Sequence, residues 1–318
     1  MIHFPPGIDA ALFLRDYWQQ RPLLIRQGLP GFVSPIDGNE LAGLALEEEV
    51  ESRLVIRDGK TGPWELHQGP FSEQDFARLP TSSPWTLLVQ AVDLWVPQVQ
   101  AIIDDFAFLP RWRMDDIMVS YANDGGGVGP HFDYYDVFLI QGWGQREWAT
   151  GDWCDESTPL LPGSSLRILD HFEPHQSWVL EPGDILYLPP RLAHRGTAVG
   201  ECLTYSLGFR APTAGEMLDD LATEVLSRGP GLFYRDPPLT PAMASDLIDP
   251  AFIDSARTLL LEALDDRERL AEWFASFMTR PKYPDLDTDD PDIARRAVLP
   301  GSDGNLTRTF INGEPSDY

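Results

Sequence analysis

The stretch GGGVGPHFDYYDVFLIQ, residues 125–141, decides the fold class of this sequence. Its glycines allow the backbone to turn sharply, and the apolar run that follows them predicts a β-strand. Several short strands at even spacing, with no helical period among them, predict an all-β sandwich or barrel. The other strand-like runs are residues 115–122, 146–151, 164–170, 177–190 and 202–209.

Helical patterns lie on both sides of this β-rich middle. Asp9 can cap a short amphipathic helix, and Thr213 with Glu216 forms a capping box for a later one. After a proline-rich connector, residues 251–279 form a further helical run with a large apolar load. Packing between two helices does not need that much apolar surface, so we expect burial against the barrel or a second subunit.

The C-terminal region is a polar, acidic connector followed by NLTRTFINGEPSDY, residues 305–318. Asn312-Gly313 is the strongest short signal for a β-hairpin, but few residues remain after it for a second strand. The sequence therefore predicts a linker and then an incomplete segment, as in a shortened form of a longer chain.

Acidic residues dominate the composition. The 318 residues include 24 Lys plus Arg and 50 Asp plus Glu, a formal net charge of -26. This charge repels phosphate backbones and anionic membranes, so direct binding to nucleic acid or to a membrane surface is disfavoured. An acidic surface aids solubility, and it also attracts a partner rich in Lys and Arg.

Cysteine content and the N-terminus bear on the cellular compartment. Cys154 and Cys202 are too few for a disulfide framework and are not spaced as a zinc site. The N-terminus lacks the basic residues and apolar core of a signal peptide, and no apolar run approaches the ~20 residues of a membrane span. We therefore expect a cytoplasmic protein.

His131-Phe132-Asp133 is a candidate pair of metal ligands, because side chains two residues apart point to the same side of a strand. Two imidazoles and one carboxylate on one face of iron(II) define the site of a non-haem oxygenase. His194, just past the predicted strand EPGDILYLPP, is the candidate for the second imidazole. An H-x-D triplet alone is a weak signal, so the glycine-rich entry and the strand end carry this prediction.

A rival set of ligands is His171-Phe172-Glu173 with His175. These residues lie between two predicted strands, in a loop expected at the surface, and no glycine-rich entry precedes them. The interpretation as surface histidines is therefore favoured over a second metal site.

Arg146 is the candidate for binding a co-substrate. 2-Oxoglutarate chelates iron through its keto-acid end, and its remote carboxylate then needs a fixed cation inside the barrel. Arg146 follows the turn GWGQ on the adjoining predicted strand, and a guanidinium binds a carboxylate through two hydrogen bonds. Without the metal motif, a solvated strand arginine would be the better interpretation.

Taken together, GGGVGPHFDYYDVFLIQGWGQREW (125–148), EPGDILYLPPRLAHRG (181–196) and LTYSLGFRAP (203–212) closely resemble the bacterial ribosomal oxygenases, which are JmjC-type protein hydroxylases. The resemblance begins at FLRDYWQQRPLLIR (13–26) and extends into the helical region. It implies a mainly β fold with helices, whose catalytic part is a double-stranded β-helix of the cupin type.

The resemblance also implies a domain order. A JmjC/cupin catalytic domain would span residues 1–210, and a helical dimerisation domain would span residues 211–279, which implies a homodimer. The remaining residues 280–318 would be a winged-helix-like segment, too short to be complete.

Site residues follow from the same resemblance. His131, Asp133 and His194 match the iron ligands of the family, and Arg146 matches its basic residue for 2-oxoglutarate. Ser120, on the predicted strand before the glycine-rich loop, matches a second contact to the same carboxylate.

The activity implied is that of a protein arginine 3-hydroxylase that uses Fe(II), 2-oxoglutarate and dioxygen. Its implied substrate is the sixteenth protein of the large ribosomal subunit, a basic partner that suits the acidic chain. Two alternatives stay open: a JmjC-type lysine demethylase, and a non-catalytic metal-binding cupin that forms a dimer.

Overall fold

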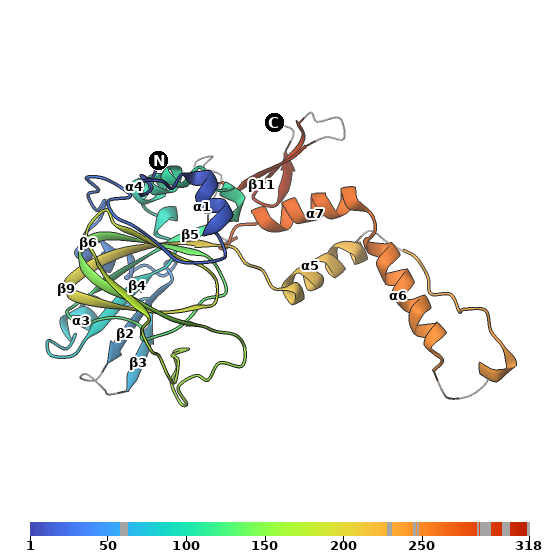
Figure 1. Cartoon of the computed structure of the whole chain (residues 1–318), viewed down its shortest axis with the longest axis horizontal. Helices are drawn as coiled ribbons and strands as arrows, with labels where there is room; N and C mark the ends of the chain where they lie inside the picture. The colour runs from blue at the N-terminus through green and yellow to red at the C-terminus, as the bar shows by residue number, and fades with distance from the viewer. Residues whose placement is uncertain are drawn as a thin grey trace. The chain divides into compact units, whose positions relative to one another are not determined.

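The structure, a computed structural model, divides the chain into two compact units, Met1–Ala211 and Pro212–Tyr318 (Figure 1). The first unit contains the β-rich middle of the sequence, and the second contains the helical region and the C-terminal strands. The structure describes residues 1–57, 63–227, 231–243, 246, 248–284, 286, 294–300 and 306–316.

Nine antiparallel strands of the first unit form one curved sheet, in the order β1-β8-β6-β9-β5-β4-β2-β3 with β7 paired to β6. This arrangement confirms the mainly β fold that the sequence predicted. The strands are β1 Leu23–Ile25, β2 Ser52–Arg57, β3 Trp64–Gln68, β4 Trp85–Val89, β5 Met114–Ala122, β6 Val137–Trp153, β7 Gln176–Leu180, β8 Ile185–Leu188 and β9 Leu192–Phe209.

The long strands β6 and β9 lie at the centre of this sheet and pair with each other along most of their length (Figure 1). Their antiparallel register shifts between Gln141 and Gln145, where the ladder is irregular. Because each shift changes which residues face the same side, Val137 and Leu139 before the irregularity pack in one apolar cluster with Trp148 after it. We call the side that carries this cluster the inner face.

The opposite side of the sheet, the outer face, carries the larger apolar core. Phe138, Tyr205 and Leu207 belong to this core together with Phe13 of the first helix, which is fully buried. Short helices and turns before β5 therefore cover the outer face and leave the inner face free of this core. These helices are α1 Ala10–Asp16, α2 Gly38–Leu44, α3 Glu73–Ala77 and α4 Pro97–Gln100, with 3-10 turns at Val92–Leu94, Ala101–Phe106 and Arg111–Arg113.

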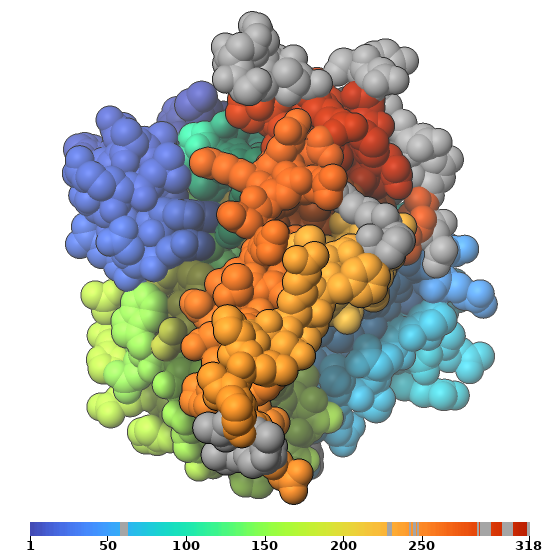
Figure 2. Space-filling model, turned by 90° about the vertical axis from the view of Figure 1, so that its right-hand side faces the viewer, coloured from blue at the N-terminus to red at the C-terminus, as the bar shows by residue number. Residues whose placement is uncertain are grey.

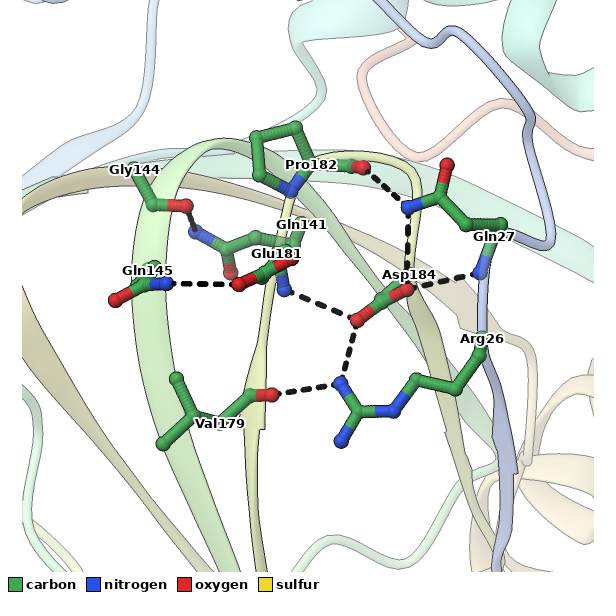
Figure 3. A network of polar contacts seen from close by, with 9 residues as sticks. All are labelled: Arg26, Gln27, Gln141, Gly144, Gln145, Val179, Glu181, Pro182 and Asp184. Carbon is green, nitrogen blue, oxygen red and sulfur yellow. Dashed lines mark hydrogen bonds and ion pairs between the residues drawn. The ribbon is translucent and has the colours of Figure 1, made fainter.

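A buried carboxylate fastens the N-terminal strand to the sheet (Figure 3). The carboxylate of Asp184 accepts hydrogen bonds from Arg26 Nη1 (2.6 Å), from the backbone N–H of Gln27 (2.8 Å) and from the backbone N–H of Glu181 (3.1 Å). Its backbone carbonyl accepts from the N–H of Gln141 (3.0 Å). One residue therefore links the end of β1, the turn before β8 and the middle of β6, and the ionised carboxylate is compensated although it is buried.

The second unit contains three helices and a small antiparallel sheet of order β10-β11-β12. The last helix, α7, packs against β10 and β11 and buries Trp273 and Met278. The predicted division of this region at residue 279 stays a prediction. The elements are α5 Ala214–Ser227, α6 Pro250–Leu264, α7 Arg267–Thr279, β10 Arg296–Pro300, β11 Leu306–Ile311 and β12 Glu314–Ser316, with a 3-10 turn at Pro241–Met243.

Helices α5 and α6 leave their apolar side chains uncovered within the single chain, and neither has a buried residue. Leu226 on α5 is 79% exposed and Leu260 on α6 is 66% exposed. In Figure 2, atoms of α5 and α6, in yellow-orange to orange, form part of the surface that faces the viewer. None of the helices in the described residues is both long and apolar enough to cross a membrane.

Two local predictions in this unit need comment. Thr213 and Glu216 form the expected capping box, with Glu216 N–H donating to Thr213 Oγ1 (3.1 Å) and Thr213 N–H donating to Glu216 Oε2 (2.7 Å). The prediction of one helical run over 251–279 is wrong, because the chain breaks after α6 and Asp266 caps a separate helix, α7. A carboxylate that accepts from the N–H three residues later starts a new helix rather than continuing the old one.

The C-terminal hairpin is more complete than the sequence predicted. Asn312 and Gly313 have φ of 49° and 88°, the left-handed conformation that a tight hairpin turn requires. The three residues of β12 then pair with β11, so the second strand exists although it is short.

Candidate metal centre

Main-chain pairing brings together the two histidines that the sequence predicted as ligands. The N–H of His131 donates to the carbonyl of His194 (3.0 Å), and the N–H of His194 donates to the carbonyl of His131 (2.8 Å). The N–H of Arg191 donates to the carbonyl of Asp133 (2.6 Å), which continues the same pairing. The glycine-rich loop therefore delivers the H-x-D segment against the start of β9.

The three side chains converge on one point. One ligand atom from each of His131, Asp133 and His194 lies within 4.8 Å of the other two. Oδ2 of Asp133 is 3.9 Å from Nε2 of His131 and 3.7 Å from Nε2 of His194. The His194 side chain is 4% exposed, whereas about a quarter of the His131 and Asp133 side chains is exposed, so the group opens to solvent on the side of the H-x-D segment.

Hydrogen bonds set the orientation and protonation of both imidazoles. Nδ1 of His131 lies 3.0 Å from the carbonyl oxygen of Gly129, and Nδ1 of His194 lies 2.9 Å from that of Leu192. A carbonyl oxygen can only accept, so each Nδ1 donates to it, and Nε2 is the ring nitrogen left to face a metal. Burial, with His131 nearby, lowers the pKa of His194 to about 4, which keeps this imidazole neutral.

The rival set does not assemble in the same way. His171, Glu173 and His175 are exposed, and His175 Nε2 pairs with the exposed carboxylate of Asp152 (3.0 Å). In the part of the chain that the structure describes, no other three His, Cys, Asp or Glu side chains come as close together as the triad. This favours the interpretation of the rival histidines as surface residues.

Arg146 projects from β6 into the interior, opposite Ala198 of β9, and is 5% exposed. Its Nε lies 3.4 Å from Sγ of Cys202, and its guanidinium carbon lies 5.7 Å from the ring centre of Trp148. Nη2 is buried and has no hydrogen-bond partner among the described residues. Burying a guanidinium nitrogen without a hydrogen-bond partner costs free energy unless an anion binds it. Arg146 is therefore suited to bind an anion.

Ser120 lies on the same inner face as Arg146. It is buried on β5, where its neighbour two residues on, Ala122, packs in one small apolar cluster with Cys202. Because residues two apart on a strand share a face, Ser120 and Ala122 both face the interior. Cys202 contacts Arg146, so Ser120 and Arg146 lie on the same face of the sheet.

Two residues near this centre escaped prediction from the sequence. Trp148 is buried beside His194, with ring centres 6.1 Å apart, and its Nε1 has no hydrogen-bond partner within the described chain. Tyr135 donates its hydroxyl to the carboxylate of Asp133, whose negative charge, with burial and Asp116, raises the pKa of this tyrosine. Trp148 could have been found as the residue two beyond Arg146 on a strand.

This geometry defines a class of protein. Two imidazoles and one carboxylate that converge on one point, in a group open to solvent on the side of His131 and Asp133, form the arrangement that non-haem iron oxygenases use. Its position inside a barrel of antiparallel strands is that of the cupin-type oxygenases.

Comparison with known proteins identifies the family. The model of the JmjC domain matches residues 101–217. The ribosomal protein uL16 3-hydroxylase of Escherichia coli (strain K12) is 41% identical over 282 residues, which cover 88% of this chain and 74% of that protein. A probable ribosomal oxygenase of Haemophilus influenzae is 40% identical over 305 residues, 92% of this chain and 74% of that protein.

Solved structures agree with the sequence comparison. The X-ray structure of E. coli YcfD superposes with a TM-score of 0.86 at 36% identity, covering 100% of this chain and 88% of that chain. A structure of the same ribosomal oxygenase in complex with cobalt and 2-oxoglutarate gives 0.83 at 35% identity, covering 99% and 87%. This chain belongs to the ribosomal oxygenase family of JmjC-domain proteins, and the resemblance described from its sequence is confirmed.

The triad can be tested by metal binding. We expect His131→Ala and Asp133→Ala each to weaken binding of Fe(II), measured by anaerobic calorimetry, on the order of 100-fold or more, because each removes one of three protein ligands. His171→Ala is the matched control and should bind the metal as the unaltered chain does. Loss of binding in His171→Ala with retention in His131→Ala would assign the metal to the rival loop.

Proposed function

We propose that this chain is an Fe(II)- and 2-oxoglutarate-dependent oxygenase that hydroxylates an arginine side chain of a ribosomal protein. The observation that carries the proposal is the combination of two convergent imidazoles and a carboxylate with a buried guanidinium whose Nη2 has no partner among the described residues. The first set suits iron(II), and the second suits the remote carboxylate of the co-substrate.

The residues of the candidate centre fit both iron(II) and 2-oxoglutarate. His131, Asp133 and His194 would hold the iron, and the keto-acid end of 2-oxoglutarate would chelate it and leave a position for dioxygen. When both are bound, they activate dioxygen, so that one oxygen atom enters succinate and the other enters a C–H bond of the substrate. The open side of the triad, beside the partly exposed His131 and Asp133, is the side on which the substrate would approach.

The protein supplies binding, orientation and exclusion of water. Nη2 of Arg146 would donate to the remote carboxylate, with the hydroxyl of Ser120 as a second donor from the same face of the sheet. The backbone carbonyls of Gly129 and Leu192 hold both imidazoles in the orientation that points Nε2 at the metal. The inner apolar cluster around Trp148 keeps the cavity dry, and a charged hydrogen bond is stronger in such surroundings.

Charge supports a basic substrate. The chain has a formal net charge of -26, and the carboxylates of Asp133 and Asp116 both act on the hydroxyl of Tyr135 beside the metal centre. A guanidinium approaching this side would meet negative potential, which favours its encounter with the site. The E. coli relative is named for hydroxylation of ribosomal protein uL16, and we propose the same protein as the substrate here. Direct contact with nucleic acid is not part of the proposal.

We further propose a homodimer in the cytoplasm, where a ribosomal protein is accessible. The exposed apolar side chains of α5 and α6, such as Leu226 and Leu260, would be buried against a partner surface. A second copy of the same chain would supply that surface.

Light scattering tests the dimer. We expect twice the mass of the 35.7 kDa chain for the unaltered protein, and the single mass for the double variant Leu226→Glu with Leu260→Glu, because two carboxylates per copy would be buried unpaired at the interface. Exposed Leu239→Glu with Val33→Glu serves as the control for added charge. A single-chain mass for the unaltered protein would contradict the dimer.

Arg146 can be tested by co-substrate dependence. We expect Arg146→Ala to raise the KM for 2-oxoglutarate by about 100-fold, the equivalent of losing a charge-assisted hydrogen-bond pair, and Arg146→Lys to recover part of this loss. The affinity for Fe(II) should stay as it was, which separates co-substrate binding from damage to the triad. Unchanged turnover at low 2-oxoglutarate would remove Arg146 from the site.

The substrate can be tested by mass spectrometry of ribosomal proteins from cells with and without the gene. We expect uL16 to be heavier by one oxygen atom, about 16 daltons, on an arginine residue only where the gene is present. Loss of a methyl group from a lysine would instead favour the demethylase, an activity for which two less similar relatives, from Brugia malayi and Aedes aegypti, are named. No change in any protein, with no succinate formed in vitro, would leave the non-catalytic cupin.

A further inference from the structure

A second cavity lies in the first unit, away from the metal centre. It has a volume of about 540 Å³ and is enclosed by the loop before α2, by α2 itself, by α3 and by the outer face of the sheet. Tyr121 and Leu203 contribute to its floor. Their chain neighbours Ser120 and Cys202 face the interior, so alternation along the strands puts this cavity on the opposite side of the sheet from the co-substrate wall.

Aromatic rings form much of the cavity wall. Trp85 on β4 and Tyr121 on β5 lie against each other with ring centres 5.8 Å apart. Phe76 of α3 and Trp143 of β6 complete the aromatic lining, and Trp143 is 49% exposed although it is a large apolar side chain. Rings arranged around a space of this size offer their negative faces to a cation as well as an apolar surface to its carbon chain.

Carboxylates surround the same aromatic floor. Asp37 and Glu40 of the α2 capping box line the cavity, and both are exposed. Glu201, at the turn within β9, accepts a hydrogen bond from the hydroxyl of Tyr121. Burial, the charge of Glu201 and, more weakly, that of Asp37 raise the pKa of this tyrosine to about 12. The charges of both carboxylates therefore reach the Tyr121 hydroxyl.

Among the described residues that line the cavity there is no Lys or Arg to neutralise these carboxylates. The capping hydrogen bonds use one oxygen of Asp37, which accepts from the N–H groups of Asn39 and Glu40, and one oxygen of Glu40, which accepts from the N–H of Asp37. The negative charge stays in place after those bonds are made. Aromatic rings with uncompensated carboxylates select an extended cationic side chain over an anion or a neutral aliphatic one.

We propose that this cavity is an exosite that binds an arginine- or lysine-bearing segment of the protein substrate, distant from the residue that is modified. The proposal rests on the proposed function for the identity of that substrate. A site on the outer face contributes to the affinity for a whole basic protein without touching the metal, the co-substrate or the target side chain. It would make a folded substrate a better one than a short peptide with the same target.

The binding experiment uses hexa-arginine as the probe and hexa-glutamate as its control, titrated into the full chain while tryptophan fluorescence is recorded. We expect hexa-arginine to bind, and Trp143→Ala and Glu40→Gln each to weaken its binding by about five- to tenfold, the loss of one cation–π contact or one charge pair. Gln at position 40 retains the capping acceptor, so the α2 helix should be preserved. Glu49→Gln, an exposed carboxylate outside the cavity, is the matched control.

The kinetic experiment compares whole uL16 with a short peptide that contains only the modified arginine. We expect Trp143→Ala and Glu40→Gln to raise the KM for the whole protein by about five- to tenfold, with kcat unchanged and the KM for the peptide unchanged. Equal effects on protein and peptide would overturn the exosite, as would hexa-arginine binding that is the same in all variants.

The two proposals fail in different ways. If no ribosomal protein is hydroxylated by the unaltered chain, the proposed function fails, and hexa-arginine binding still decides whether the cavity takes a cationic segment. If uL16 is hydroxylated with the same KM by Trp143→Ala, Glu40→Gln and Glu49→Gln, the exosite alone fails.

Discussion

The pair of main-chain hydrogen bonds between His131 and His194 is the constraint on which the centre depends. These bonds join a loop that leaves the glycine-rich segment to the first residues of β9, and they bring two residues far apart in the chain within reach of one metal. The side chains need little further adjustment, because the carbonyls of Gly129 and Leu192 already hold both rings. Backbone geometry therefore sets the metal site before any metal binds.

The two faces of the curved sheet carry different parts of the molecule. The inner face carries the apolar cluster around Trp148 and the buried guanidinium of Arg146, whereas the outer face carries the large core with Phe13 and the cavity above Tyr121. The irregular register of β6 against β9 makes this division possible. Without a shift between Gln141 and Gln145, Arg146 and Val137 would point to opposite sides of the sheet.

Much of the site could be predicted from the sequence because its signals are local. The period of two along a strand puts His131 and Asp133 on one side, and the strand end before His194 marks the second histidine. Trp148 escapes prediction because an aromatic residue in a strand is ordinarily core, and only its buried Nε1 without a partner in the described chain distinguishes it. Tyr135 lies in the bend before β6, and only the bond of its hydroxyl to Asp133 distinguishes it. The break at Asp266 escapes prediction because no Gly or Pro interrupts residues 251–279.

By itself, the sequence determined the β-rich fold, the family and the three candidate metal ligands, because alternation, glycine turns and an H-x-D pair are properties of short segments. The tertiary structure alone decided that the rival histidines near His171 do not converge, that Arg146 is buried with Nη2 lacking a partner among the described residues, and that a second cavity lies behind Tyr121. These properties depend on the register between β6 and β9 and on which loops cover each face. Such long-range pairings leave no mark in any single stretch of the chain.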